Sequence, residues 1–285
     1  MPKLLIDTNH LCIRTLFAGK IVGTEESFHY HRHLVLNTIL SNIRKFEPSE
    51  VILAVDDKKN WRKKVYPEYK ANRKLIRDAS DFPWDKYYVY MDEFLTSLQE
   101  LPFKVIRDPF SESDDIIAVL SKHSQKGTII LTSDSDYIQL LQHKHNKLFD
   151  PIKKRYIEEK DPLKLLKIKI VSGDSGDNIP AIKPRVGEKT AIKLIDTGEL
   201  EKLLENEEIK QNYLRNERLI SFDYIPVVIQ KEILNTYNNY KFPEGNVDYL
   251  GWFVSHKLKA LSSELQNIRP IFQKLKGNSE LDELF

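Results

Sequence analysis

Two aspartates separated by one residue follow an apolar stretch near the middle of the chain. Asp134 and Asp136 come directly after segment 128–132, whose β-branched residues indicate a buried strand, and Ile138 and Leu141 then repeat at helical spacing. In open α/β sheets, ligands bind at the carboxyl ends of the strands. Two carboxylates at this spacing suit a divalent cation, but one of them can instead cap the following helix. The pair is therefore informative only if other acids converge on it.

Acidic residues also end the other predicted strands or begin the helices that follow them. They are Asp7, Asp56, Glu112, Asp114 and Asp115. A strand–helix–strand order predicts a parallel sheet with right-handed crossovers, which brings these positions to one edge of the sheet. Capping explains one or two acids, whereas three carboxylates within four residues repel one another unless cations bind them. We therefore expect an oxygen-only metal site at this edge.

A second acidic stretch lies in the glycine-punctuated segment 172–180, which contains Asp174 and Asp177. The next segment is typical of a short hairpin that leads into a helix, and its basic residues are Lys183, Arg185 and Lys189. Outward-facing backbone N–H groups, a helix N-terminus and basic side chains grip phosphates without reading bases. We therefore expect a contact to a nucleic-acid backbone next to the acidic site.

Basic and aromatic residues alternate between residues 58 and 90. The segment includes Arg62, Tyr69, Lys70 and Arg73. Cations neutralise phosphates and aromatic faces stack on unpaired bases, so the segment is a candidate clamp for a single strand or a strand end. A solvated amphipathic helix with extended lysine side chains is the alternative that the composition leaves open.

The overall composition restricts the class of protein. The 285 residues, 41% of them hydrophobic, suit one large or two modest globular domains, and no apolar run approaches the length that spans a bilayer. The first residues lack the pattern of a signal peptide. Cys12 is the single cysteine, which excludes an intrachain disulfide and a cysteine-rich zinc site and fits a reducing cytoplasm.

The small net charge of +2 conceals a segregation of charge. Setting aside the nine acids of the two groups leaves 33 of the 42 acidic side chains against 44 basic ones, an excess of about 11. A basic body around an acidic pocket suits a polyanionic substrate, although evenly mixed solvated charge is the alternative.

The order and spacing of six short motifs resemble the flap endonuclease (5′-nuclease) family. The motifs are Ile-Asp-Thr-Asn, Val-Asp-Asp, Tyr-Lys-Ala-Asn-Arg, Glu-Ser-Asp-Asp, Ser-Asp-Ser-Asp and Gly-Asp-Ser-Gly-Asp-Asn-Ile-Pro. More narrowly, Trp61-Arg62 and segments 219–226 and 253–261 resemble the replicative ribonucleases H of T4-type tailed phages.

The resemblance implies an α/β fold with a mainly parallel central sheet flanked by helices, a PIN-like core, and a C-terminal helical domain with a helix–hairpin–helix element. Residues 1–160 would form the nuclease domain, with an arch at about 58–90. Residues 161–285 would form the duplex-binding domain, with the helix–hairpin–helix element at about 165–196.

The resemblance also implies a 5′-to-3′ exonuclease or flap endonuclease with ribonuclease H activity, as in removal of RNA primers from lagging-strand fragments in phage replication. Two Mg²⁺ ions, replaceable by Mn²⁺, would activate the attacking water and stabilise the leaving 3′ oxygen. The first metal cluster corresponds to Asp7, Asp56, Glu112, Asp114 and Asp115, and the second to Asp134, Asp136, Asp174 and Asp177. The implied catalytic residues are Asp7, Asp56, Asp134 and Lys70, and the implied nucleic-acid contacts are Arg62, Tyr69, Lys70, Arg73, Lys183, Arg185 and Lys189.

The hairpin departs from the family pattern, because segment 181–185 carries no glycine where the family commonly has them. The K⁺ ion that the family often binds there therefore stays an open expectation, whereas the phosphate grip does not depend on it.

The expected partners are RNA–DNA hybrids, duplex and flap DNA, a single-stranded-DNA-binding protein and, through an apolar tail, a replication sliding clamp. The tail residues are Leu281, Leu284 and Phe285, which resemble the clamp-binding peptides of phage replication proteins; a frayed tail is the alternative. We expect a monomer that acts in the bacterial host cytoplasm, away from membranes. A non-catalytic protein that binds branched DNA stays open as the alternative function.

Overall fold

A six-stranded sheet forms the centre of the molecule in the computed structural model, which describes residues 1–243, 245 and 247–282. The strand order is β3-β2-β1-β4-β5-β6, with β6 antiparallel to β5 and all other neighbours parallel. The strands are β1 (Lys3–Asp7), β2 (Glu50–Ala54), β3 (Lys104–Ile106), β4 (Thr128–Leu131), β5 (Asn146–Asp150) and β6 (Arg155–Ile157). The expected α/β class with a mainly parallel sheet is confirmed.

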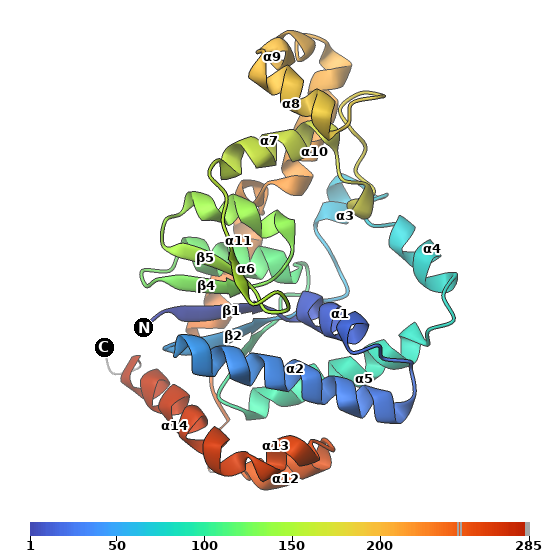
Figure 1. Cartoon of the computed structure of the whole chain (residues 1–285). Coiled ribbons are helices and arrows are strands. Elements are labelled where there is room, and N and C mark those ends of the chain that lie inside the picture. The colour runs from blue at the N-terminus through green and yellow to red at the C-terminus, as the bar shows by residue number, and fades with distance from the viewer. Residues whose placement is uncertain (244, 246, 283–285) are drawn as a thin grey trace.

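The central strands are buried on both faces, which explains their continuous apolar sequences. Along β1, Leu4 and Ile6 pack into one hydrophobic cluster, whereas Leu5 packs into another on the opposite face. Helices cover both faces (Figure 1). Those that precede β4 and pack on the sheet are α1 (Thr8–Ala18), α2 (Glu25–Phe46), α5 (Trp84–Ser97) and α6 (Ser113–Lys122).

The helices after the sheet form two groups. The first has its own apolar cluster and lies at the top of Figure 1: α7 (Pro162–Ser172), α8 (Glu188–Asp196), α9 (Glu199–Leu203) and α10 (Glu207–Ile220). The second packs against the sheet domain: α11 (Val227–Asn238), α12 (Tyr249–Ser255), α13 (Lys259–Ser263) and α14 (Leu265–Asp282). Residues 161–285 are expected as one helical unit, and their described helices divide their packing between the sheet domain and a separate apolar cluster.

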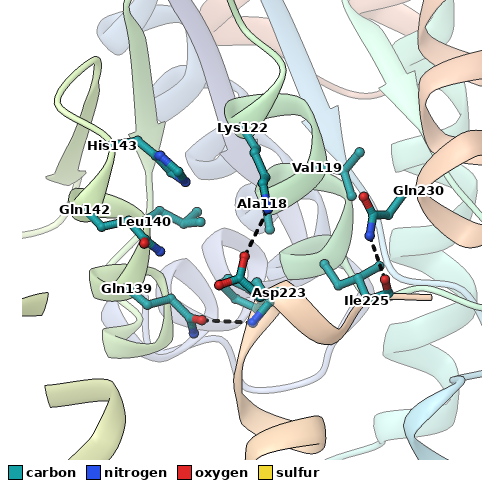
Figure 2. Close-up of a pocket in the computed structure, with 11 residues that line it drawn as sticks. Ala118, Val119, Lys122, Gln139, Leu140, Gln142, His143, Asp223, Ile225 and Gln230 are labelled. Atoms are coloured by element: carbon teal, nitrogen blue, oxygen red, sulfur yellow. Dashed lines mark hydrogen bonds and ion pairs between the residues drawn. The ribbon is translucent and has the colours of Figure 1, made fainter. Parts of the chain in front are cut away.

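The chain crosses back to the sheet domain through a short 3₁₀ helix, η4 (Phe222–Tyr224), that docks on α6 and on the 3₁₀ helix η2 (Ser135–Gln142) (Figure 2). The N–H of Phe222 donates to Gln139 Oε1 at 2.9 Å, and Lys122 Nζ lies 3.0 Å from Asp223 Oδ1. The cavity among these side chains measures about 20 Å³, so the junction is a packed interface.

The segment expected as an arch leaves the sheet domain and returns to it. It contains α3 (Arg62–Val65) and α4 (Asn72–Asp78) before α5, and no residue of α4 is buried. Figure 1 shows α4 at the side of the molecule, away from the sheet.

Two expectations concern features outside the sheet. The helices within residues 1–243, 245 and 247–282 are too short or too polar to span a membrane. The tail residues Leu284 and Phe285 lie outside the described residues, as does the side chain of Leu281.

Candidate active site

The carboxylates of Asp7 and Asp56 meet where β1 and β2 reach the start of α6. Asp7 Oδ1 accepts a hydrogen bond from Ser113 Oγ at 2.9 Å, and Asp7 Oδ2 accepts one from the Tyr137 hydroxyl at 2.8 Å. Asp56 Oδ1 accepts from the backbone N–H of Ser113 at 2.7 Å. The convergence expected from the parallel sheet therefore exists, and one residue, Ser113, connects the two acids.

These carboxylates carry charge that the protein does not balance. Burial and then the charges of Glu112 and Asp7 raise the pKa of Asp56 to about 6, and burial raises the pKa of Asp7. Burial and the neighbouring acids likewise raise the pKa of Asp114 well above its ordinary value, although Arg62 opposes them. In the described part of the chain, neither Asp7 nor Asp56 forms an ion pair with a lysine or arginine.

Three of the acids also cap helices, so the capping alternative holds together with the clustering. Asp7 Oδ1 accepts from the N–H of His10 at 3.0 Å, and Asp134 Oδ1 accepts from the N–H of Asp136 at 3.0 Å. Asp174 Oδ1 accepts from an N–H group at the start of the 3₁₀ helix η3 (Ser175–Asp177) at 2.8 Å. In each of the three aspartates the capping bond is made by Oδ1. This bond fixes the orientation of the carboxylate and therefore the direction in which its Oδ2 points.

His10 is a site residue that the sequence patterns did not indicate. Its Nε2 lies 2.7 Å from Ser133 Oγ and its Nδ1 lies 3.8 Å from Asp134 Oδ2. A single histidine in an apolar helix gives no signal in the sequence, because its role depends on a contact to a strand end more than 100 residues away.

Asp115 differs from the other expected metal ligands. Its side chain is fully buried, and both of its oxygens accept from the guanidinium of Arg62, at 2.8 and 2.9 Å. Asp115 Oδ2 also accepts from the indole N–H of Trp61 at 3.0 Å and from the backbone N–H of Glu112 at 3.1 Å. In this structure both oxygens of the Asp115 carboxylate therefore accept from protein donors.

Arg62, expected as a nucleic-acid contact, is equally inaccessible. Its side chain is 1% exposed, and its Nε donates to the backbone carbonyl of Leu219 at 2.8 Å. Arg62 therefore ties the arch segment to α6 and to the end of α10.

The second acidic group consists of Asp136, Asp174 and Asp177, whose carboxylates each offer an oxygen within 4.8 Å of the others. Gly173 makes the required turn before Asp174, because its φ is +74° and a Cβ there would lie 2.4 Å from the carbonyl oxygen of Ile179. The cleft beside this group has a volume of about 530 Å³ and is also lined by Asp114 and Asp134.

Lys169 of α7 completes this second group, and sequence patterns did not indicate it. Its ammonium contacts Asp136 Oδ1 and lies 2.7 Å from Asp174 Oδ2. In the sequence, Lys169 is one of several lysines on an apolar and basic helix, and such lysines are usually solvated.

The base of the arch joins the two acidic groups. The Tyr69 hydroxyl lies 2.9 Å from Glu112 Oε2 and 3.1 Å from Asp177 Oδ2, so both carboxylates share its single proton. Lys70 Nζ lies 2.5 Å from Glu112 Oε1 and 3.7 Å from Asp177 Oδ2, and Arg73 lies 2.7 Å from Asp177 Oδ1. Burial raises the pKa of Glu112, but the charges of Lys70 and Arg62 outweigh it and bring that pKa to about 2.

The hairpin between α7 and α8 places its basic residues at the surface, beside a cavity of about 460 Å³ lined by Lys183 and Arg185. Lys183 is half-buried, and Arg185 and Lys189 are exposed. Within the described chain, none of the three forms an ion pair with an acid, so their charges remain available to an anion.

Comparisons with known proteins agree with this arrangement. Residues 2–175 match the 5′-3′ exonuclease N-terminal resolvase-like domain, and residues 171–268 match the C-terminal domain of T4 RNase H. Ribonuclease H of Enterobacteria phage T4 is 30% identical over 92% of this chain and 94% of its own length. The 5′-3′ exonuclease of Buchnera aphidicola is 32% identical over 68% of this chain and 69% of its own length.

Solved structures share the fold. The T5 D15 protein, co-crystallised with metal ions, has a TM-score of 0.63 and 18% identity, with 82% of this chain and 99% of that chain covered. The catalytic core of Rad2 in complex with DNA substrate has a TM-score of 0.51 and 13% identity, with 95% of this chain and 92% of that chain covered.

Proposed function

The chain belongs to the 5′-3′ exonuclease family and is a metal-dependent 5′-nuclease, and we propose that its two acidic groups hold Mg²⁺ ions for phosphodiester hydrolysis in duplex, nicked or flap substrates. Mn²⁺ would substitute, since both ions accept hard oxygen ligands. The substrates are RNA–DNA hybrid and duplex or flap DNA, attacked from the 5′ end.

The observation that carries the proposal is the unbalanced charge at the end of the sheet. Asp7 is buried, Asp56 and Asp114 are half-buried, and the pKa values of all three are raised, because negative charge that is removed from water is costly. A divalent cation offsets that cost because it is attracted to several carboxylates at once. The donors are all oxygens, which fits Mg²⁺ or Mn²⁺ and does not fit a cysteine-rich zinc site.

The ions would supply a Lewis acid that activates the attacking water and stabilises the leaving 3′ oxygen. The protein then has to orient the phosphate and balance its charge. Lys70 and Arg73 lie at the edge of the same cleft as Asp134, so their charges can offset the negative charge of the reacting phosphate. Tyr69 holds Glu112 and Asp177 in place through its hydroxyl.

The duplex beyond the cut would be held by the hairpin. Lys183, Arg185 and Lys189 surround the N-terminus of α8, where backbone N–H groups and the helix dipole favour phosphate. The resemblance to the family is the support for a K⁺ ion in this hairpin. Contacts of this kind position a duplex without reading its sequence.

The chain is similar over nearly its full length to a phage ribonuclease H, which supports a role in removing RNA primers during phage replication in the host cytoplasm. In that role a sliding clamp would bind the tail Leu281, Leu284 and Phe285, and a single-stranded-DNA-binding protein is a further expected partner. Deleting residues 281–285 should abolish clamp retention in a pull-down, and full retention would refute the tail's role.

Digestion of 5′-labelled RNA–DNA hybrid, nicked and flap substrates, with product lengths resolved, tests the proposal. The wild type should release short 5′ products when Mg²⁺ is present and none in EDTA. Asp134→Asn should lower the rate by about 10³-fold or more, because it removes several kcal/mol of transition-state stabilisation, while duplex binding is retained. Tight binding of flap DNA with no product from the wild type would instead support the non-catalytic alternative.

A further inference from the structure

Lys169 lies inside the second acidic group but has no part in the chemistry proposed above. We propose that its ammonium competes with the divalent ion for Asp136 and Asp174, so that the second site fills only when an ion displaces it. This inference rests on the proposed function, because it assumes that the second acidic group binds a divalent ion.

The contacts place Lys169 where a cation would be bound. Its Nζ contacts Asp136 Oδ1 and lies 2.7 Å from Asp174 Oδ2. These two carboxylates supply two of the three clustered oxygens of the second group, and Asp177 supplies the third. The ammonium and a metal ion therefore use the same pair of acids, and both cannot be bound there at full strength.

The surroundings make the ion pair stronger than a solvated one. The side chain of Lys169 is 26% exposed, and those of Asp136 and Asp174 are 25% and 20% exposed. Partial removal from water strengthens the attraction between opposite charges. A lysine ammonium is charged at neutral pH, so it leaves these carboxylates by displacement.

The first acidic group has a different charge balance. Among the described residues, Asp7 and Asp56 have no lysine or arginine partner, although Glu112 pairs with Lys70 and Asp114 lies near Arg62. In the second group every acid is paired: Asp136 and Asp174 share Lys169, and Asp177 pairs with Lys70 and Arg73. An ion bound by Asp7 and Asp56 breaks no ion pair of these two acids, but an ion at the second group must displace Lys169 from Asp136 and Asp174. The two sites should therefore differ in affinity, with the second weaker.

The displaced side chain has room to move. Lys169 lines the cleft of about 530 Å³ together with Glu188 and Ser172. Lysine has a flexible four-carbon stem, so its ammonium can swing into this space without moving α7. The barrier to filling the second site is then mainly electrostatic and not a rearrangement of the fold.

The variant that removes the competing charge is Lys169→Met, and Lys169→Gln is a second neutral version. Lys167→Met is the matched control, because Lys167 lies on the same helix but pairs with Glu201, outside the acidic groups. Lys169→Arg keeps the charge. Thermal unfolding of each variant in EDTA verifies that it is folded.

The experiment measures Mn²⁺ binding in the absence of nucleic acid. Titration calorimetry and the electron paramagnetic resonance signal of free Mn²⁺ report the binding. Wild type should show a tighter and a weaker class of site. Lys169→Met and Lys169→Gln should tighten the weaker class by about tenfold or more, as expected for loss of one adjacent positive charge, and leave the tighter class unchanged. Lys167→Met and Lys169→Arg should behave like wild type.

An unchanged or weakened second class in both neutral variants would overturn the role of Lys169. The proposed function fails in a different way, namely if the wild type binds no Mn²⁺ at either group and cleaves no substrate. If the wild type is active and has two classes of Mn²⁺ site, but the neutral variants bind Mn²⁺ like the wild type, the inference about Lys169 is wrong and the proposed function still holds.

Discussion

The guanidinium of Arg62 and the carboxylate of Asp115 form a doubly hydrogen-bonded pair in which the two side chains are 1% and 0% exposed. Arg62 belongs to the arch segment and Asp115 to the first turn of α6, next to Glu112 and Asp114. The pair therefore fixes the arch base relative to the acidic group.

Removing one partner of this pair should strongly destabilise the fold. Asp115→Asn removes the charge closest to the buried guanidinium and leaves only Glu112 and Asp114, at 3.4 and 3.9 Å, as counter-charges. Breaking a buried pair typically costs about 3–5 kcal/mol. Chemical denaturation of the metal-free protein measures the loss. Asp223→Asn is the matched control, since its pair with Lys122 is exposed and should be worth at most about 1 kcal/mol. Equal, small losses in the two variants would show that the buried pair does not hold the arch base.

The raised pKa of Asp56 predicts a stability that decreases with pH in the absence of metal. The folded state binds this proton more tightly than the unfolded state, because burial and then Glu112 and Asp7 raise the pKa to about 6. The contribution is therefore complete below the ordinary pKa of aspartate, near 4, and is lost as the pH rises through about 6.

Asp56→Asn should accordingly stabilise the protein in EDTA at pH 7.5, by roughly 2–3 kcal/mol, and abolish cleavage in Mg²⁺. Asp57→Asn, at the exposed neighbouring position, should do neither. Denaturant unfolding at pH 5 and pH 7.5 measures both effects. A lower stability of Asp56→Asn in EDTA would contradict the unbalanced-charge account of the first group.

The arch is held at its base by contacts to the loop of the second acidic group. Asn72 Nδ2 donates to the carbonyl of Ser175 at 2.8 Å, and Asn178 Nδ2 donates to the carbonyl of Glu68 at 2.8 Å. Each such bond is worth about 0.5–1.5 kcal/mol, and α4 itself buries no side chain.

Replacing Asn72 and Asn178 together by alanine should therefore increase amide hydrogen exchange in residues 66–78 while global stability changes little. Asn239→Ala, which removes a comparable exposed bond at the end of α11, is the control. Unaltered exchange in the arch would mean that the contacts of Arg62, Tyr69, Lys70 and Arg73 maintain its position without these two hydrogen bonds.

The hairpin should contribute to affinity through charge. Lys183→Ala, Arg185→Ala and Lys189→Ala should each weaken duplex binding and reduce the slope of log affinity against log salt by about 1. Lys259→Ala, on α13, is the control. Fluorescence anisotropy at several salt concentrations measures the slopes, and slopes equal to that of wild type would exclude the hairpin from the duplex contact.

The sequence predicted the features that depend on local pattern. The apolar strands and the acids at their ends were recognisable because parallel order brings strand ends to one edge. What the sequence did not indicate depends on partners far along the chain. Asp115 binds Arg62, His10 contacts Ser133 and Lys169 contacts Asp136. The hydrophobic periodicity of the sequence does not distinguish these side chains from solvated ones.

The return of α11 to α14 to the sheet domain was also not anticipated. Their apolar faces join the clusters on the sheet, and the chain reaches them after η4, which docks through Phe222 on Gln139. Packing partners of amphipathic helices follow from tertiary contacts, which a single sequence does not state.

Anomalous diffraction from crystals grown with Mn²⁺ tests the central claim most directly. Two anomalous peaks are predicted, one among Asp7, Asp56 and Asp114 and the other among Asp136, Asp174 and Asp177, with the second peak appearing at the higher Mn²⁺ concentration and the Lys169 ammonium moved away from Asp136. An anomalous map with no peak at either group, from crystals of protein that cleaves 5′-labelled substrate in Mn²⁺, would contradict the account.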